Sequence, residues 1–158
     1  MTTPRNDDGS SFSHGIPENP YNPHAWILGE PTIGTGVWIG AFCVIDGSGG
    51  LEIGNGCDIS CGAQIYSHST VDRCLSRGQA AISRASTSIG DYVHIGANAV
   101  VLMGATIGSN SVIGAGAVVK EFTVAPEFSL IVGVPARVIV DGARRSNAGH
   151  NDQIATGV

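Results

Sequence analysis

A six-residue repeat between Ser88 and Thr123 constrains the fold of this chain more than any other feature. Each unit opens with a branched aliphatic residue, usually followed by glycine, and a small residue stands four places later. The opening aliphatic residues are Ile89, Ile95, Val101, Ile107, Ile113 and Val119. Residues separated by even steps point to the same side of an extended chain, whereas an α-helix would place them around its circumference. The repeat therefore predicts a parallel β-helix, in which three units form one coil and the coils stack.

The same period is found in the first half of the chain, with two interruptions. The earlier aliphatic positions are Ile27, Ile33, Ile39, Ile45, Ile53, Ile59 and Ile65. Because Ile45 and Ile53 are eight residues apart, the segment DGSGG is expected to bulge at a corner. The repeat stops between residues 67 and 88, which predicts one long protruding loop, and within it LSRG followed by AAIS predicts a helical turn.

These boundaries predict a single all-β domain with flanking segments. Residues 27–140 are assigned to the β-helix, with loop 67–88 as an insertion. Residues 1–26 are expected to be a disordered polar tail followed by a proline-rich cover over the first coil. The runs SLIVG and ARVIV flank Val134-Pro135 and predict a short C-terminal strand pair, after which residues 141–158 are expected to be a flexible tail.

Composition limits the partners and the compartment of the protein. The net charge is -5 and no basic stripe is present, which argues against nucleic acid. The first residues contain no apolar run, so we expect neither a signal peptide nor a membrane span, and a cytoplasmic location. Charged residues are only 13% of the chain, which favours outer faces covered by other copies. The four cysteines, with Cys43 and Cys57 at small inward positions, are expected to be buried, reduced and structural.

The repeat resembles that of the left-handed β-helix acyltransferases, the hexapeptide-repeat family. The resemblance covers about residues 27–140. It includes GVPARVI, which is similar to a closing motif of acyl-CoA-using members, and QIYSHSTV, which is similar to the segment that carries the catalytic histidine in sugar acetyltransferases. The resemblance implies a left-handed coil, a homotrimer, acetyl-CoA as co-substrate, and a sugar or nucleotide-linked sugar as acceptor, as in surface polysaccharide biosynthesis. The two substrates would meet between neighbouring subunits.

His68 is the strongest catalytic candidate. It follows Ile65 by an odd number of residues and should point outward at the base of the loop. Acyl transfer needs a base for the proton of the attacking hydroxyl or amine, and histidine suits that role near neutral pH. The alternative is a polar surface histidine that anchors the loop. Asp46, Asp58 and Asp72 are candidates to orient the ring, and the sequence does not choose among them.

The family resemblance also implies a cofactor-binding surface on the late coils. Ala97 and Ala115 would let a pantetheine chain run along the solenoid, although corners also demand small residues. Lys120 and Arg137 match the family's phosphate-binding positions. His94 is expected to line the substrate site, or else to be an exposed turn residue.

The loop carries three arginines that suit an anionic acceptor. Arg73 and Arg77 are assigned to substrate binding, and Arg84 shares their segment. The alternative role of these side chains is to keep a protruding loop soluble.

Two other classes of protein share the predicted fold. One is a γ-carbonic-anhydrase-like zinc enzyme, which uses three histidines at subunit junctions. Only His68 and His94 lie in the predicted coils and no closely spaced histidine pair exists, so we predict no metal site. The other is a non-catalytic solenoid that serves as a scaffold or binding surface.

Overall fold

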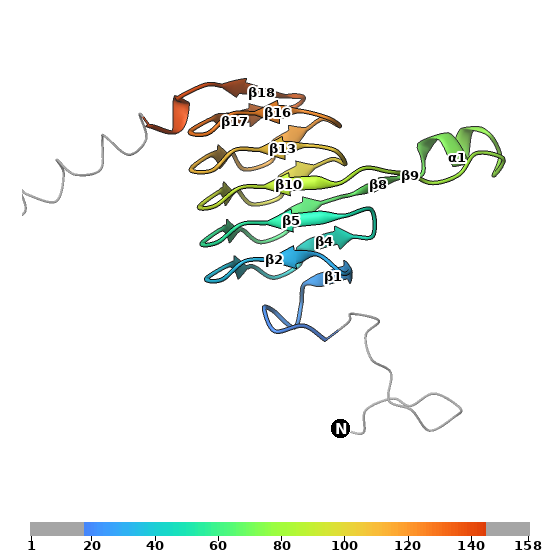
Figure 1. Cartoon of the computed structure of the whole chain (residues 1–158), viewed down its shortest axis with the longest axis horizontal. Helices are drawn as coiled ribbons and strands as arrows, with labels where there is room; N and C mark the ends of the chain where they lie inside the picture. The colour runs from blue at the N-terminus through green and yellow to red at the C-terminus, as the bar shows by residue number, and fades with distance from the viewer. Residues whose placement is uncertain (1–17, 145–158) are drawn as a thin grey trace, which may run out of the picture.

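The computed structural model describes residues 18–144, which form a three-sided prism of stacked coils (Figure 1). The predicted fold class, an all-β left-handed parallel β-helix with one protruding loop and a closing strand pair, is confirmed. The predicted tails at 1–17 and 145–158 lie outside the described residues.

Three sheets run along the prism, and each full coil contributes one strand to each. Sheet 1 contains β1 (Trp26–Gly29), β4 (Val44–Gly47), β7 (Gln64–Ile65), β12 (Val100–Val101) and β15 (Val118–Val119). Sheet 2 contains β2 (Thr32–Ile33), β5 (Leu51–Ile53), β10 (Thr87–Ile89), β13 (Thr106–Ile107) and β16 (Val124–Ala125). Sheet 3 contains β3 (Trp38–Ile39), β6 (Asp58–Ile59), β11 (His94–Ile95), β14 (Val112–Ile113), β17 (Leu130–Gly133) and β18 (Ala136–Ile139).

The repeated aliphatic residues fill the interior of the prism. Parallel pairing aligns them in columns, for example Ile45, Ile65, Val101 and Val119 in sheet 1. Each of these four side chains is fully buried. Burial of such a side chain stabilises the fold by about 1.5–3 kcal/mol relative to an exposed position. The six-residue period therefore acts through one continuous core that no single coil could form alone.

Glycine at some corners is required both by backbone conformation and by the coil above. Gly104 has φ of +75° and Gly56 has φ of +63°. A Cβ at Gly104 would collide with the ring of Phe122, and one at Gly56 would lie 2.6 Å from the ring of Tyr92. These corners therefore exclude any side chain larger than hydrogen.

The insertion forms an arm that projects from the corner between sheets 1 and 2 (Figure 1). Its base is an antiparallel pair, β8 (His68–Ser69) with β9 (Ser83–Arg84), and its tip carries α1 (Val71–Leu75). The helix precedes the predicted position at LSRG and AAIS, because left-handed φ angles at Arg77 and Gly78 end it. The expected loop 67–88 is also too long, since Thr87 and Ser88 already belong to β10.

Both ends of the described chain are packed. At the first coil, Ala25 is fully buried and Tyr21 packs against the core, so the proline-rich segment does cover the prism. At the last coil, β18 returns antiparallel to β17. Ala143 is buried and its amide donates to the carbonyl of Phe128 at 3.0 Å, so the packed chain extends to residue 144.

Two of the four cysteines depart from expectation. Cys43 and Cys57 are buried and free, as predicted. Cys61 and Cys74 are also free but exposed, because Cys61 lies at a corner and Cys74 on α1. Within residues 18–144, no helix is long and apolar enough to cross a membrane.

Candidate active site

His68 lies at the base of the arm, where it contacts a buried carboxylate. Its Nδ1 lies 2.6 Å from Oδ2 of Asp46 and 3.2 Å from Oγ of Ser48. The side chain of His68 is 30% exposed, whereas that of Asp46 is only 1% exposed. The ring therefore bridges a buried acid on one side and solvent on the other. Of the three carboxylates considered from sequence, Asp46 is the one that contacts His68.

Hydrogen bonds hold Asp46 in its charged form. Its Oδ1 accepts from the amide of Ser48 at 3.1 Å, and its Oδ2 accepts from the amide of Ser67 at 3.1 Å. Burial alone would raise the pKa of Asp46, but the hydrogen bonds from Ser48, Ser67 and His68 outweigh it and lower the pKa to about 2. Asp46 is therefore an anion at neutral pH.

The anion determines which nitrogen of His68 carries the proton. An ionised carboxylate is an acceptor only, so Nδ1 donates to Asp46, and in the neutral ring the lone pair lies on Nε2. Nε2 makes no hydrogen bond to any of the described residues. His68 thus has a free basic nitrogen and a fixed orientation, which is the arrangement that proton abstraction requires.

Tyr66 forms one wall beside His68. The two rings meet edge to face, with centroids 6.4 Å apart and an interplanar angle of 89°. The phenol of Tyr66 donates to Oε1 of Gln64 at 2.7 Å. Burial, and secondarily the charge of Asp46, raise the pKa of this phenol, so Tyr66 remains neutral and acts as a packing surface.

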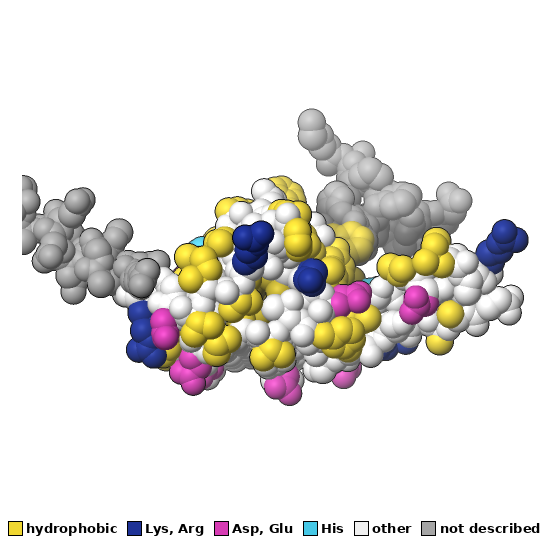
Figure 2. All heavy atoms as spheres, turned by 90° about the horizontal axis from the view of Figure 1, so that it is seen from above, with side chains coloured by type: hydrophobic (Ala, Val, Ile, Leu, Met, Phe, Trp, Pro, Cys, Tyr) yellow, Lys and Arg dark blue, Asp and Glu magenta, His cyan; other side chains and the backbone are white. Residues whose placement is uncertain are grey.

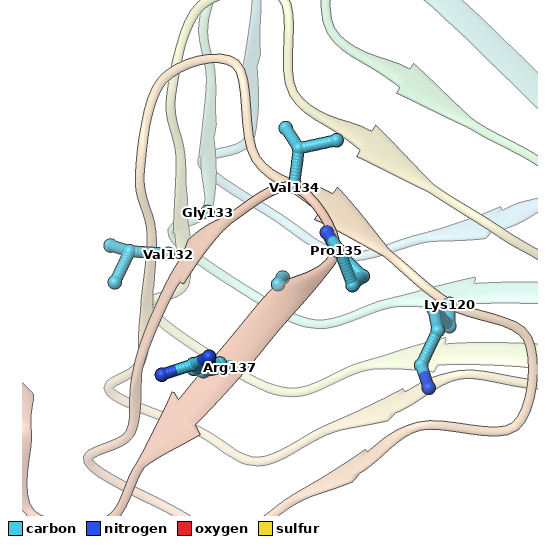
Figure 3. A pocket seen from close by; sticks show the side chains of 7 residues that line it. Lys120, Val132, Gly133, Val134, Pro135 and Arg137 are labelled. Atoms are coloured by element: carbon cyan, nitrogen blue, oxygen red, sulfur yellow. The ribbon is translucent and has the colours of Figure 1, made fainter.

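A second concavity lies at the far end of the prism. Lys120 and residues 132–137 line this cationic pocket, whose volume is about 460 Å³. Lys120 and Arg137 lie on opposite sides of the Val134-Pro135 turn (Figure 3). Lys120 follows β15 and His68 follows β7, with β12 between them in sheet 1. The two coils are therefore separated along the prism by two strand spacings, about 10 Å.

Ala97 and Ala115 lie in one corner column between sheets 3 and 1. The amide of Gly116 donates to the carbonyl of Ala97 at 2.8 Å, which fixes the two coils in register. A Cβ at Gly96 would collide with the backbone of Ala115, so successive coils are in close contact at this corner. It ends near Gly133, a residue of the cationic pocket.

The remaining predicted site residues are not gathered around His68 within one chain. His94 is exposed on β11 of sheet 3, a different face of the prism. Arg73 lies on α1, and Arg77 follows it on the arm. From above, the arm presents basic, acidic and hydrophobic side chains to solvent (Figure 2). Among residues 18–144, no cluster of three or more histidine, cysteine, aspartate or glutamate side chains has metal-binding geometry.

The sequence named Asp46 and Arg84 without placing them beside His68, and it gave no indication of the two serines at the site. Ser48 and Ser67 belong to neighbouring coils, and their hydrogen bonds to Asp46 depend on how the coils stack. Arg84 is paired with His68 in the β8–β9 ladder. The loop segment has no repeat from which this pairing could have been predicted. The eight-residue spacing between Ile45 and Ile53 was the sequence feature that could have indicated these contacts. It marks a longer corner, and Gly49 in that corner packs against Ser67 and Arg84 at the base of the arm.

Comparisons with known proteins give a consistent result. Residues 86–121 match the family model described as bacterial transferase hexapeptide (six repeats). Carnitine operon protein CaiE of Escherichia coli strain K12 is 29% identical over 123 residues, which are 75% of this chain and 62% of CaiE. This chain therefore spans less than two thirds of the length of that relative.

Solved structures with a similar fold include two bacterial acetyltransferases. The hexapeptide-repeat-containing acetyltransferase VCA0836 of Vibrio cholerae is 32% identical, with a TM-score of 0.61 over 69% of this chain and 61% of that protein. Another structure of VCA0836 contains acetyl coenzyme A and matches with 26% identity and a TM-score of 0.52 over 73% of this chain and 66% of that protein. A maltose O-acetyltransferase of Clostridium difficile 630 is 26% identical, with a TM-score of 0.53 over 72% of this chain and 67% of that protein.

Proposed function

This chain has the hexapeptide repeats and the left-handed β-helix fold of the hexapeptide-repeat acyltransferases, and from that premise we propose that it is an acyl-CoA-dependent transferase. The donor is acetyl-CoA and the acceptor is a hydroxyl or amine of a sugar or nucleotide-linked sugar, in surface polysaccharide biosynthesis. The contact of His68 with Asp46 at 2.6 Å carries the proposal, because it provides a base with one free nitrogen. The acetyl-CoA complex of VCA0836 and the maltose acceptor of a second neighbour support the two substrates.

The proposed reaction begins with proton transfer to His68. Nε2 accepts the proton of the acceptor as its oxygen or nitrogen attacks the thioester carbonyl. The new C–O or C–N bond forms, the C–S bond breaks, and the leaving thiolate takes the proton from the imidazolium. Asp46 stabilises the imidazolium and holds its ring in place, and Asp46 remains ionised throughout.

The cationic pocket supplies the charges that coenzyme A requires. Lys120 and Arg137 bind its phosphates, and arginine is suited to them because its guanidinium forms two parallel hydrogen bonds. The pantetheine chain runs beside Ala97 and Ala115 toward the coil of His68. Along the prism axis, the coil of Lys120 and the coil of His68 are about two strand spacings apart.

A homotrimer completes the proposed enzyme, with sheet 1 facing a neighbouring copy. The outward residues of sheet 1 are apolar except for one, and they are Trp26, Val44, Gln64, Val100 and Val118. A contiguous apolar face on a protein surface marks an interaction site. In this assembly His94 of sheet 3 and the arm arginines Arg73 and Arg77 approach the substrate from an adjacent subunit. Four free cysteines fit a reducing compartment, and we place the enzyme in the cytoplasm.

The test is a two-part assay on the purified protein. Titration calorimetry with coenzyme A should show binding that weakens by about tenfold in Arg137→Ala, because a charge-assisted hydrogen bond is lost. Acetyl-CoA is then offered with panels of sugars and nucleotide-amino sugars, and free thiol release identifies the acceptor. Lack of coenzyme A binding, or thiol release that no acceptor accelerates, would overturn the proposal.

A further inference from the structure

We infer that Arg84 is the specificity residue for the acceptor, and that it binds a phosphate group of that acceptor beside His68. The inference rests on the proposed acyl transfer at His68 and narrows its substrate class to phosphate-bearing sugars. Its basis is the juxtaposition of Arg84 with His68 in the β8–β9 ladder, which brings a cation to the catalytic corner.

The ladder puts Arg84 and His68 on the same side of the arm. The two residues are direct partners in an antiparallel pair. Side chains of such partners project from the same face, with Cβ atoms about 5 Å apart. The amide of Ala85 also donates to the carbonyl of Ser67 at 3.1 Å on one side of the pair, and Ser69 pairs with Ser83 on the other. Arg84 is therefore held at its backbone close to the base, and only its long side chain adjusts.

Gly49 provides the space in which Arg84 is seated. A Cβ at Gly49 would lie 3.2 Å from the Cβ of Arg84 and would collide with the carbonyl oxygen of Ser67. The amide of Gly49 donates to Oγ of Ser67 at 2.8 Å. The corner of the preceding coil thus packs against the Cβ of Arg84. A fully solvated loop arginine would have no such contact.

The guanidinium of Arg84 has no carboxylate partner among residues 18–144. The ion pairs in this range are His68 with Asp46 and Arg144 with Asp141. Asp46 is 1% exposed and its oxygens already accept hydrogen bonds from Ser48, Ser67 and His68. Arg84 is exposed, and its five N–H donors are open to a ligand.

Phosphate is the ligand chemistry that best matches this arrangement. A planar guanidinium forms paired hydrogen bonds to phosphate oxygens, so it fixes orientation as well as charge. Anchoring a phosphate at Arg84 would hold the attached sugar next to Nε2 of His68. Arg73 and Arg77 lie farther out, on α1 and beyond it, and α1 occupies the tip of the arm (Figure 1). We therefore assign the phosphate contact beside His68 of the same chain to Arg84 and not to the arm arginines.

The experiment measures binding of two phosphate probes to protein saturated with coenzyme A, which occupies the cationic pocket. Calorimetry is performed with UDP and with glucose 1-phosphate, which distinguish a nucleotide-linked from a simple phosphorylated acceptor. We expect Arg84→Gln to weaken binding of the preferred probe by about tenfold or more, because a charge-assisted bidentate contact is lost. Arg84→Lys should give an intermediate affinity, since it keeps the charge without the fork.

Control variants separate the loss of a specific phosphate contact from a general loss of charge or of folding. Arg144→Gln removes an equal charge at the far end of the prism and should leave probe binding unchanged. Unchanged coenzyme A affinity in Arg84→Gln would show that this variant is folded. The inference is overturned if wild-type protein binds neither probe, if Arg84→Gln binds as tightly as wild type, or if Arg73→Gln causes the loss instead. Failure to bind coenzyme A would overturn the proposed function, and the same probe titrations without coenzyme A would then judge Arg84 separately.

Discussion

Sheets 1 and 2 share the same coils and the same inward isoleucines and valines, yet their outer faces differ. The outward row of sheet 1 is Trp26, Val44, Gln64, Val100 and Val118. The matching row of sheet 2 is Thr32, Glu52, Ser88, Thr106 and Val124. One row is apolar except for Gln64, and the other is polar except for Val124. Inward residues thus define the prism, whereas outward residues define what each face contacts.

The candidate site lies at the boundary between these two faces. His68 follows β7 of sheet 1, and the chain returns from the arm into β10 of sheet 2. A neighbouring copy on sheet 1 would form one wall beside His68 and leave the polar side open to an acceptor. His68 therefore lies at the edge of the proposed interface and beside the polar face.

The largest expected effect is on catalysis at the boundary. His68→Ala should lower kcat by about a thousandfold, because the base for the attacking group is removed. Thr106→Ala on sheet 2 should leave kcat within about twofold of the wild-type value, since surface substitutions of this kind change the stability of the fold very little. Steady-state thiol release, with the acceptor that the panel screen identifies, measures both. Full activity in His68→Ala would end the assignment of catalysis to this corner.

Asp46→Asn should reduce kcat by about a hundredfold or more, because an amide no longer fixes the proton on Nδ1. Coenzyme A affinity should be unaffected, since the cationic pocket is on a later coil. The pH profile of kcat in the variant separates positioning from folding: a shifted profile indicates loss of the carboxylate's influence on His68. An unchanged kcat and profile would show that Asp46 is only structural.

Assembly should distinguish the two faces directly. Val118→Glu on sheet 1 should dissociate the proposed homotrimer at micromolar protein, because it would bury an unpaired charge. Thr106→Glu on sheet 2 is the matched control and should remain trimeric. Light scattering coupled to size-exclusion chromatography measures both masses. Dissociation by the sheet 2 variant alone would reverse the assignment of the interface.

A smaller effect is expected on stability at the corner that joins the two sheets. Gly104→Ala should lower the free energy of unfolding by about 3 kcal/mol, because the added Cβ meets Phe122 and the positive φ is strained. Gly116 has φ of +66° but no atom within 4 Å of an added Cβ, so Gly116→Ala should cost only about 1 kcal/mol. Denaturant titrations of both variants test the difference. Equal costs would mean that packing of Phe122 contributes nothing.

The smallest effect is the dependence of stability on pH. The pKa of Asp46 is lowered to about 2 in the folded protein. Ionised Asp46 therefore stabilises the fold at every pH above the pKa that this carboxyl has in the unfolded chain. That contribution, about 2 kcal/mol, is lost as pH falls from about 4 to about 2. Denaturant titrations at a series of pH values across this range should show that the free energy of unfolding falls more steeply for wild type than for Asp46→Asn. Parallel declines would contradict the role of the charge.

The sequence predicted the fold well because the fold depends on short-range periodicity. The isoleucines and valines marked the inward positions, and Val134-Pro135 marked the closing turn. Their spacing follows from strand geometry, which is local. The same logic predicted His68 at the base of the arm.

The surroundings of His68 could not be predicted in the same way. Asp46 and Arg84 are 22 and 16 residues from His68, and they meet it only because coils stack and the arm folds back. To identify Asp46 and not Asp58 or Asp72 as the partner of His68, one must know which residues of successive coils are paired. The position of α1 depended on turn conformations at Arg77 and Gly78, which composition alone did not indicate.

The return of β18 against β17 has a consequence for growth of the solenoid. A further coil would need a parallel edge with evenly spaced amides and carbonyls, and the reversed strand offers an antiparallel pattern instead. Head-to-tail polymerisation into a fibre is thereby blocked along sheet 3. A short hairpin thus keeps an inherently extendable architecture finite.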